Sequence, residues 1–106
     1  MGKQKSILEQ LDVFGKDISK EITLRKLLLF GSRDTGKAHK DSDIDLLIVS
    51  SSFRKVKPFK RAIKLYDHWK LDYPVDLLCL TPEEFEKKKK QIGTIQQAVK
   101  EGIEIL

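Results

Sequence analysis

The stretch FGSRDTGKAHKDSDIDLLIV, residues 30–49, carries most of the structural information in this chain. Its first half comes close to the phosphate-binding loop G-x-x-x-x-G-K-[ST], with Gly31, Gly36 and Lys37 at the required spacing. That loop needs a Ser or Thr hydroxyl after the lysine to ligate Mg²⁺, but this chain has Ala38. The next expected strand also follows too soon for the helix that such a loop opens. We therefore exclude a phosphate loop of this type.

The second half of the same stretch places two carboxylates at the start of an apolar segment. Asp43 and Asp45 flank Ile44, and side chains two residues apart on a strand share a face, with about 6.6 Å between their Cα atoms. Carboxylates at this separation can converge on one Mg²⁺. An Asp-Ser-Asp sequence is also common turn chemistry before a strand. The pair alone does not distinguish the two interpretations.

A third carboxylate has the same setting, because Asp76 lies near the start of the apolar segment PVDLLCL, residues 74–80. If this strand neighbours the one at 44–49, three carboxylates line one site. Gly31-Ser32 ends a further apolar segment, where glycine permits a tight turn whose N–H groups could hold phosphate oxygens. Three acids for two Mg²⁺ ions about 3.5–4 Å apart, beside such a turn, are what nucleotidyl transfer requires. Asp76 is the candidate to help remove the proton of the attacking hydroxyl.

The remaining segments predict the helices and strands around these motifs. Apolar residues at helical spacing predict helices at about 4–19, 58–70 and from about 94, and apolar runs predict strands at 23–30, 44–49 and 74–80. Thr81, Pro82 and Glu84 form a capping box that opens a further helix, TPEEFEKKKK, whose four lysines suit its C-terminal end. The final residues, GIEIL, are expected to be extended.

The helix expected at 58–70 has a mixed character. Its lysines and arginine are expected on a solvated basic face, and a contact surface for an acidic partner or nucleic acid is the alternative. The expected apolar stripe is Phe59, Ala62, Ile63, Tyr66 and Trp69, and the expected basic residues are Lys57, Lys60, Arg61 and Lys64.

Size and composition predict a single soluble domain over residues 1–106, with a formal net charge of +5 that favours an anionic partner. The single cysteine, Cys79, sits in an apolar run and excludes an internal disulfide framework. His39 and His68 show no metal-ligand spacing and are expected to be surface or packing residues. No apolar run reaches membrane-spanning length and the polar N-terminus is no signal peptide, so we expect a cytoplasmic protein without a membrane partner.

Together these motifs resemble the DNA polymerase beta superfamily of nucleotidyltransferases and, within it, the minimal nucleotidyltransferases, or MNT proteins. The resemblance rests on residues 30–49 and on PVDLL at 74–78, and the tail from Thr81 is similar too, so it covers nearly the whole chain. It implies an α/β (α+β) nucleotidyltransferase fold, with a small mixed β-sheet flanked by helices.

The resemblance also implies a site and its ligands. ATP is the implied substrate, and Mg²⁺, as two ions, is the implied cofactor. For Arg33 a salt bridge is the alternative to a phosphate contact. The residues implied to ligate Mg²⁺ and to catalyse are Asp43, Asp45 and Asp76, and those implied to bind the nucleotide are Gly31, Ser32 and Arg33.

MNT proteins are typically paired with a HEPN-domain protein, often an RNase toxin, and neutralise it by transferring AMP from ATP to a tyrosine. The resemblance therefore implies a Mg-dependent protein adenylyltransferase that acts as antitoxin of a type VII-like HEPN/MNT pair. We expect no further domain to grip an acceptor in 106 residues, which fits an acceptor supplied by the toxin. Direct nucleic-acid binding is not expected, and a homo- or hetero-oligomer is compatible with this function.

Two other functions stay open from the sequence. The domain could neutralise its partner by occlusion, as a binding module in which the carboxylates matter little. Transfer to a small molecule, as in the related aminoglycoside-modifying enzymes, would need an acceptor pocket for which a short chain has little material. The Asp43→Ala, Asp45→Ala double variant separates occlusion from catalysis, because an occluding module should still protect cells.

Overall fold

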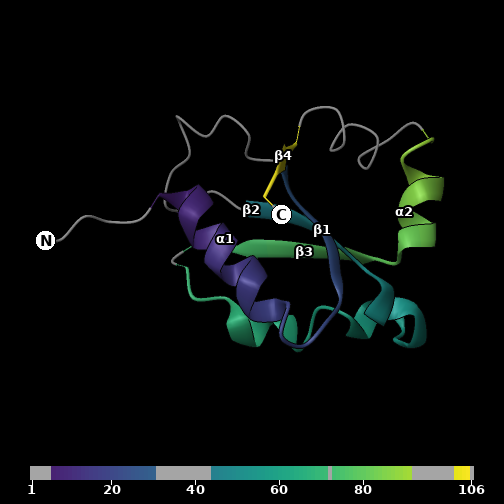
Figure 1. Cartoon of the computed structure of the whole chain (residues 1–106), viewed down its shortest axis with the longest axis horizontal. Coiled ribbons are helices and arrows are strands. Elements are labelled where there is room, and N and C mark those ends of the chain that lie inside the picture. Colours follow the sequence, from purple (N-terminus) through teal and green to yellow (C-terminus); the bar gives the residue numbers. More distant parts are fainter. Residues whose placement is uncertain (1–5, 31–43, 72, 92–101, 106) are drawn as a thin grey trace, which may run out of the picture.

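The computed structural model describes residues 6–30, 44–71, 73–91 and 102–105. Figure 1 shows a four-stranded sheet crossed by one long helix, with short 3₁₀ segments below it and a second helix at one end. The elements in chain order are α1 (Ile7–Ile18), β1 (Leu24–Phe30), β2 (Ile44–Ser50), η2 (Ser51–Lys55), η3 (Pro58–Lys60), η4 (Leu65–His68), β3 (Val75–Leu80), α2 (Pro82–Lys88) and β4 (Ile103–Glu104).

The sheet is mixed, and its strand order is β3-β2-β1-β4. β1 runs antiparallel to both β2 and β4, whereas β2 and β3 run parallel. Parallel neighbours need a crossover connection, and here the 3₁₀ segments provide it. The small mixed sheet with flanking helices is therefore confirmed, and so is the extended character of the tail, since Ile103–Glu104 pairs with β1.

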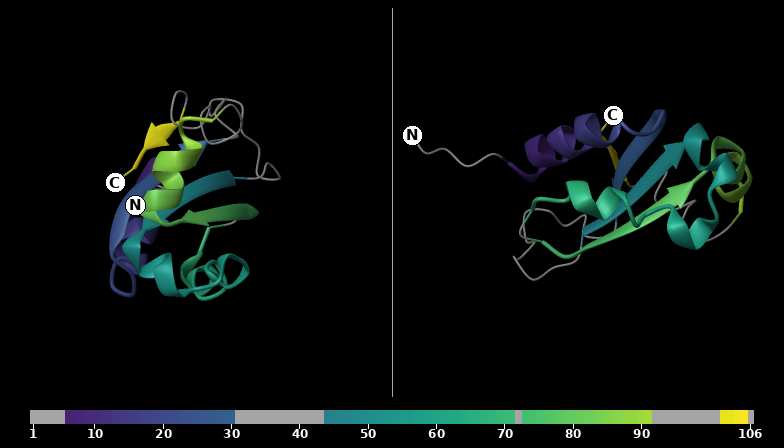
Figure 2. Two further views of the ribbon diagram at one scale, coloured as in Figure 1. Left: turned by 90° about the vertical axis from the view of Figure 1, so that its right-hand side faces the viewer. Right: turned by 90° about the horizontal axis from the view of Figure 1, so that it is seen from below.

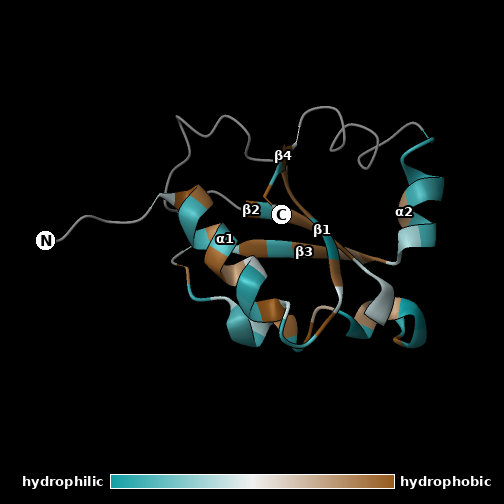
Figure 3. Ribbon diagram, viewed as in Figure 1, coloured by the Kyte–Doolittle hydropathy of each residue, from teal (hydrophilic) through white to brown (hydrophobic). Residues whose placement is uncertain are grey.

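The two faces of the sheet pack against different helices. The larger core lies on the side of α1, which lies to one side of the sheet in the right-hand view of Figure 2 and carries both polar and apolar residues in Figure 3. Its buried residues include Leu11, Phe14 and Ile18 of α1. The other face carries a smaller cluster in which Phe85 of α2 covers one end of the strands.

Both helices begin with reciprocal caps. The Ser6 hydroxyl accepts a hydrogen bond from the Glu9 amide at 3.1 Å, while the Ser6 amide donates to the Glu9 carboxylate at 2.9 Å. Thr81 and Glu84 make the same two bonds at 3.1 and 2.9 Å at the start of α2. The capping box predicted at Thr81 is thus confirmed, and it fixes where β3 ends and α2 begins.

The prediction of an α-helix at 58–70 is wrong. The chain forms η3, a turn and η4 there, and the expected apolar stripe faces the core only in part, since Ala62 and Trp69 pack against it. Phe59 and Ile63 are exposed, while Leu65 and Arg61 are buried. A 3₁₀ helix has about 3.0 residues per turn against 3.6 for an α-helix, so the phase of the inward side chains shifts. The basic face is corrected in the same way, because Arg61 belongs to the interior.

Two smaller expectations can be placed as well. Cys79 is buried on β3, as its apolar setting predicted. Within the part of the chain that the structure describes, no helix has the length and apolar character needed to cross a membrane. The helix predicted from about 94 and the histidine at position 39 lie outside the described residues.

Candidate active site

The structure brings two of the three predicted carboxylates together. Asp45 on β2 and Asp76 on β3 are direct partners in the parallel register. Neighbouring strands lie about 4.7–4.9 Å apart, and paired residues point to the same face of a sheet. The condition that the sequence set for a common site, that the strand at 44–49 neighbours the strand at 74–80, is therefore met.

The alternation along β2 determines the face on which the pair lies. Ile44 and Leu46 are buried in the core on the α1 side, so Asp45 between them points to the opposite face. Asp45 is half-buried, whereas Asp76, on the outer strand, is exposed. The two carboxylates thus share one face, and the one on the edge strand is the more accessible to solvent.

The backbone around the pair is held on both sides. The Ile44 amide donates to the Pro74 carbonyl at 2.8 Å, which joins the first residues of β2 and β3. On the other side Phe30, the last residue of β1, is the antiparallel partner of Asp45. Asp45 therefore lies between the ends of β1 and β3, and hydrogen bonding within the sheet fixes all three strands at this point.

The remaining predicted site residues adjoin this position in the sequence. Gly31, Ser32 and Arg33 follow Phe30 directly, and Asp43 precedes Ile44. All four lie outside the described residues. Their roles as nucleotide and metal ligands remain predictions from the sequence, attached to strand ends that the structure does place.

The paired carboxylates fit the donor chemistry of Mg²⁺. They are hard oxygen ligands on adjacent strands, and like charges directly opposite each other in a sheet destabilise it unless a cation compensates. The described ranges contain no group of three His, Cys, Asp or Glu side chains that could hold a metal. The third expected ligand, Asp43, would have to complete the set.

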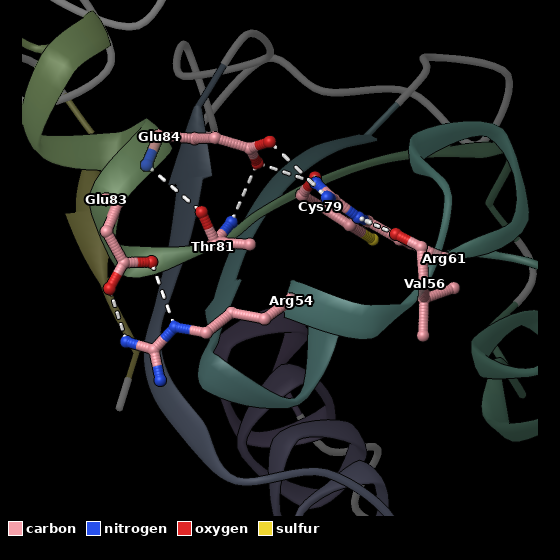
Figure 4. A network of polar contacts seen from close by, with 7 residues as sticks. All are labelled: Arg54, Val56, Arg61, Cys79, Thr81, Glu83 and Glu84. Atoms are coloured by element: carbon pink, nitrogen blue, oxygen red, sulfur yellow. Dashed lines mark hydrogen bonds and ion pairs between the residues drawn. The ribbon is translucent and has the colours of Figure 1, made fainter.

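A polar network that the sequence did not predict lies at the opposite end of β3 (Figure 4). Arg61 donates to the backbone carbonyls of Val56 and Cys79 at 2.9 and 3.1 Å and forms a bidentate ion pair with Glu84 at 2.6 and 3.3 Å. It lowers the pKa of the Glu84 carboxyl through these hydrogen bonds. The network fastens the 3₁₀ segments to the start of α2.

A second arginine forms a parallel pair nearer the surface (Figure 4). Arg54 of η2 makes a bidentate pair with Glu83, with one bond of 3.0 Å from Nε, and this lowers the pKa of Glu83 to about 2. The sequence carried no signal for either pair, since the partners are 23 and 29 residues apart. Neither arginine is free to bind a phosphate.

His68 has the packing role that the sequence assigned to it. Its Nδ1 lies 2.6 Å from the Asp17 carboxylate of α1, and its Nε2 lies 2.7 Å from Glu21. The hydrogen bond to Asp17 is the largest of the interactions that raise the pKa of His68. The residue therefore joins η4 to the end of α1, and we assign it no part in the carboxylate site.

Comparison with known proteins supports the same reading of the fold. Residues 9–104 match the family model described as the nucleotidyltransferase domain, which is most of the chain. Among curated proteins, the chain is 29% identical over 101 residues to "Putative protein adenylyltransferase MJ0141" of Methanocaldococcus jannaschii, covering 93% of this chain and 98% of that protein.

Two solved structures share the fold. A crystal structure of a "putative nucleotidyltransferase" from Sulfolobus solfataricus superposes with a TM-score of 0.62 at 22% identity, covering 98% of this chain and 89% of that one. A crystal structure described as "the toxin-antitoxin with AMP-PNP" gives a TM-score of 0.58 at 24% identity, covering 95% of this chain and 73% of that one.

Proposed function

The chain belongs to the nucleotidyltransferase domain family, and from this premise we propose that it is a Mg-dependent protein adenylyltransferase. Its acceptor is a tyrosine hydroxyl of a HEPN-domain toxin, and the transfer of AMP from ATP makes it the antitoxin of a type VII-like pair in the cytoplasm. The pairing of Asp45 with Asp76 is the observation that carries the proposal. Two carboxylates side by side on one face of a sheet are suited to bind a divalent cation.

The relatives support the choice of acceptor class. The similar protein of Methanocaldococcus jannaschii is named "Putative protein adenylyltransferase MJ0141". One structural neighbour is described as a toxin-antitoxin with AMP-PNP. A protein acceptor also fits a domain of 106 residues, because the acceptor then brings its own binding surface. The HEPN class and the tyrosine come from the resemblance of the motifs.

The proposed reaction is an in-line displacement at the α-phosphorus of ATP. The acceptor oxygen forms a bond to this phosphorus while the bond to the oxygen that bridges to the β-phosphate breaks, and pyrophosphate leaves. The exposed Asp76 carboxylate takes the proton of the attacking hydroxyl. Mg²⁺ held by the carboxylates would neutralise charge at the transferring phosphate.

The strands give Asp45 and Asp76 positions that suit the roles proposed for them. Asp45, held between β1 and β3, is the fixed ligand, and Asp76, on the edge strand, faces the incoming acceptor. Asp43 completes the metal ligands, while the backbone and hydroxyl groups of Gly31 and Ser32 hold the triphosphate, with Arg33 beside them. Positioning of this kind accounts for much of the catalysis of phosphoryl transfer.

The test is transfer to a defined acceptor. The purified chain is incubated with Mg²⁺, each nucleoside triphosphate in turn, and each protein encoded beside its gene, and the products are analysed by intact mass. The expected result is a gain of AMP units on the partner with ATP, lost in the Asp43→Ala, Asp45→Ala double variant. Asp12→Asn, which alters a half-buried acid paired with Lys16 on α1, is the matched control.

Occlusion predicts a different outcome. If the double variant still binds the partner and protects cells, and the wild type adds no mass to it, the domain is a binding module and the adenylyltransferase proposal is wrong.

A further inference from the structure

A row of large apolar side chains is exposed along the segment that joins η3 to η4. The exposed fractions are 73% for Phe59, 61% for Ile63 and 43% for Tyr66. They alternate along the segment with Arg61 and Leu65, which are buried, and so lie on its solvent side. Contiguous exposed apolar side chains of this size mark interaction sites more often than isolated ones do.

The exposure of this row is imposed by the opposite side of the segment. Leu65 is buried in the main core, and Arg61 is held by Glu84 and by two backbone carbonyls. Rotating the segment to bury Phe59 and Ile63 would expose Leu65 and break the Arg61 bonds. The row therefore faces outward as a fixed property of the fold.

One end of the row lies close to the candidate active site. The Tyr66 hydroxyl donates to the Val75 carbonyl at 3.4 Å, and Val75 directly precedes Asp76. In Figure 1 the segment runs along the sheet beside β3, the edge strand that carries Asp76. The Asp76 side chain points to the face opposite α1, whereas Leu65 packs on the α1 side, so a protein that covers the row would reach the exposed carboxylate by extending around the edge of β3.

The charges beside Phe59 and Ile63 are mostly positive, although Glu21 lines one pocket with Lys60 and Lys64 and the exposed Asp67 follows Tyr66. Lys57, Lys60 and Lys64 are exposed beside the row, and the sequence has no acidic residue between 51 and 66. Lys60 Nζ lies 5.9 Å from the centre of the Phe59 ring. An occupant that complements this surface needs apolar side chains along its centre and acidic side chains along its margin.

We propose that the row Phe59–Ile63–Tyr66, with its margin of Lys57, Lys60 and Lys64, docks the protein acceptor through an acidic amphipathic segment. Docking there holds the acceptor hydroxyl at Asp76. This inference rests on the proposed function, because it names the surface that the protein substrate uses. An RNA would use the lysines and stack on the aromatic rings, but it would gain little from Ile63.

The test compares two pairs of matched substitutions. Phe59→Ser with Ile63→Ser removes the centre of the row, and Leu8→Ser with Val13→Ser removes two side chains of α1 that are 44% and 50% exposed. The acceptor is the protein, encoded beside the gene, that binds or gains AMP in the wild-type assay. Three measurements are made: the acceptor Kd, the steady-state kinetics of AMP transfer (kcat and KM), and the binding of AMP-PNP with Mg²⁺.

The row variant is expected to weaken acceptor binding at least about tenfold and to raise KM by a similar factor, with kcat and AMP-PNP binding unchanged. The α1 variant should leave all three within about twofold. Lys60→Glu with Lys64→Glu provides a second test at the margin, where slower association and a reduced salt dependence are expected. It also keeps the test decisive if the row variant folds poorly.

The outcomes separate the two proposals. Unchanged acceptor binding and KM in both the row and margin variants would overturn the docking surface while leaving adenylyl transfer in place. Acceptor binding that depends on the row, without any AMP transfer, would support the surface and overturn the proposed function. Two further outcomes, each with acceptor binding unchanged, would also overturn the docking proposal. In the first, the wild type is a dimer and the row variant is a monomer. In the second, a labelled RNA binds the wild type and the α1 variant but does not bind the row variant.

Discussion

Asp45 and Asp76 occupy equivalent register positions on two parallel strands, but their surroundings differ. Asp45 is half-buried on a strand with neighbours on both sides, whereas Asp76 is exposed on the edge strand. A carboxylate in the first position can be held still, and one in the second can meet a molecule arriving from solution. The asymmetry suits a fixed metal ligand beside a group that accepts a proton.

The Asp76→Asn variant tests this division of roles. Asn keeps the shape of the side chain but is a poor base and a neutral ligand, so AMP transfer is expected to fall by at least about 100-fold. Because Asp76 is exposed and the substitution removes its repulsion with Asp45, the melting temperature without metal should not fall and should rise slightly. Initial rates by intact mass measure the transfer, thermal denaturation measures the melting temperature, and Asp12→Asn is the control for both. Retention of more than a tenth of the wild-type rate would remove Asp76 from the catalytic set.

Ligand removal gives a second prediction that needs no acceptor. AMP-PNP with Mg²⁺ should raise the melting temperature of the wild type, since a ligand that binds only the folded state stabilises it by mass action. Excess EDTA should abolish most of the shift, and Asp45→Asn should reduce it strongly. Differential scanning fluorimetry measures all three. An equal shift with EDTA present would show that nucleotide binding does not depend on a divalent metal.

The sequence predicted the features that depend on local signals. Apolar runs placed the strands of Asp45 and Asp76, and the Thr81–Glu84 capping box set the start of α2 correctly, because hydrogen bonds three residues apart can be recognised in the sequence. Whether these two strands are neighbours in the sheet could not be predicted from the sequence and entered only as an assumption. Strand pairing is decided by distant segments, which no local pattern specifies.

The segment 58–70 shows why the rest could not be predicted. Its spacing suits an α-helix, but its conformation follows from distant partners, among them Glu84, 23 residues beyond Arg61. A buried arginine in a row of surface-like lysines gives no signal of its own. Because the segment is not an α-helix, Phe59 and Ile63 are exposed to solvent, and the exposed row could be found only in the structure.

The two arginine pairs predict contrasting stabilities. Arg61→Ala removes a nearly buried guanidinium and leaves the Val56 and Cys79 carbonyls without it, so the free energy of unfolding should fall by about 2–4 kcal/mol. Arg54→Ala breaks an exposed pair with Glu83, and a much smaller loss is expected. Urea denaturation of both variants measures the difference. Equal losses would contradict the importance assigned to burial.

Cys79 should be an unreactive thiol in the folded protein. Burial raises its pKa to about 12, so the thiolate, which is the reactive form, is about one part in 10⁴ at pH 8. Alkylation by iodoacetamide should therefore be very slow in native buffer and fast in guanidinium chloride. Mass spectrometry follows both, and rapid native labelling would mean that β3 opens readily.

The His68 contacts predict a change of stability with pH. Hydrogen bonds, first to Asp17 and then to Glu21, raise the folded pKa of His68 above its ordinary value of 6.5. Their contribution is complete below about pH 6.5 and is lost as the pH rises through the raised value. The pKa of Asp17 is lowered from 3.8, chiefly by His68, so its contribution is present above pH 3.8 and is lost as the pH falls through the lowered value.

Stability from this contact should therefore be greatest between about pH 4 and 6.5 and should decline into the alkaline range. Melting temperatures measured from pH 5 to 9 should show this decline in the wild type and a flatter profile in His68→Gln. Asp67→Asn, which alters an exposed acid on the same η4 segment, should keep the wild-type slope. If His68→Gln declines as steeply as the wild type, another group sets the pH dependence, and the link between η4 and α1 does not depend on the charge of His68.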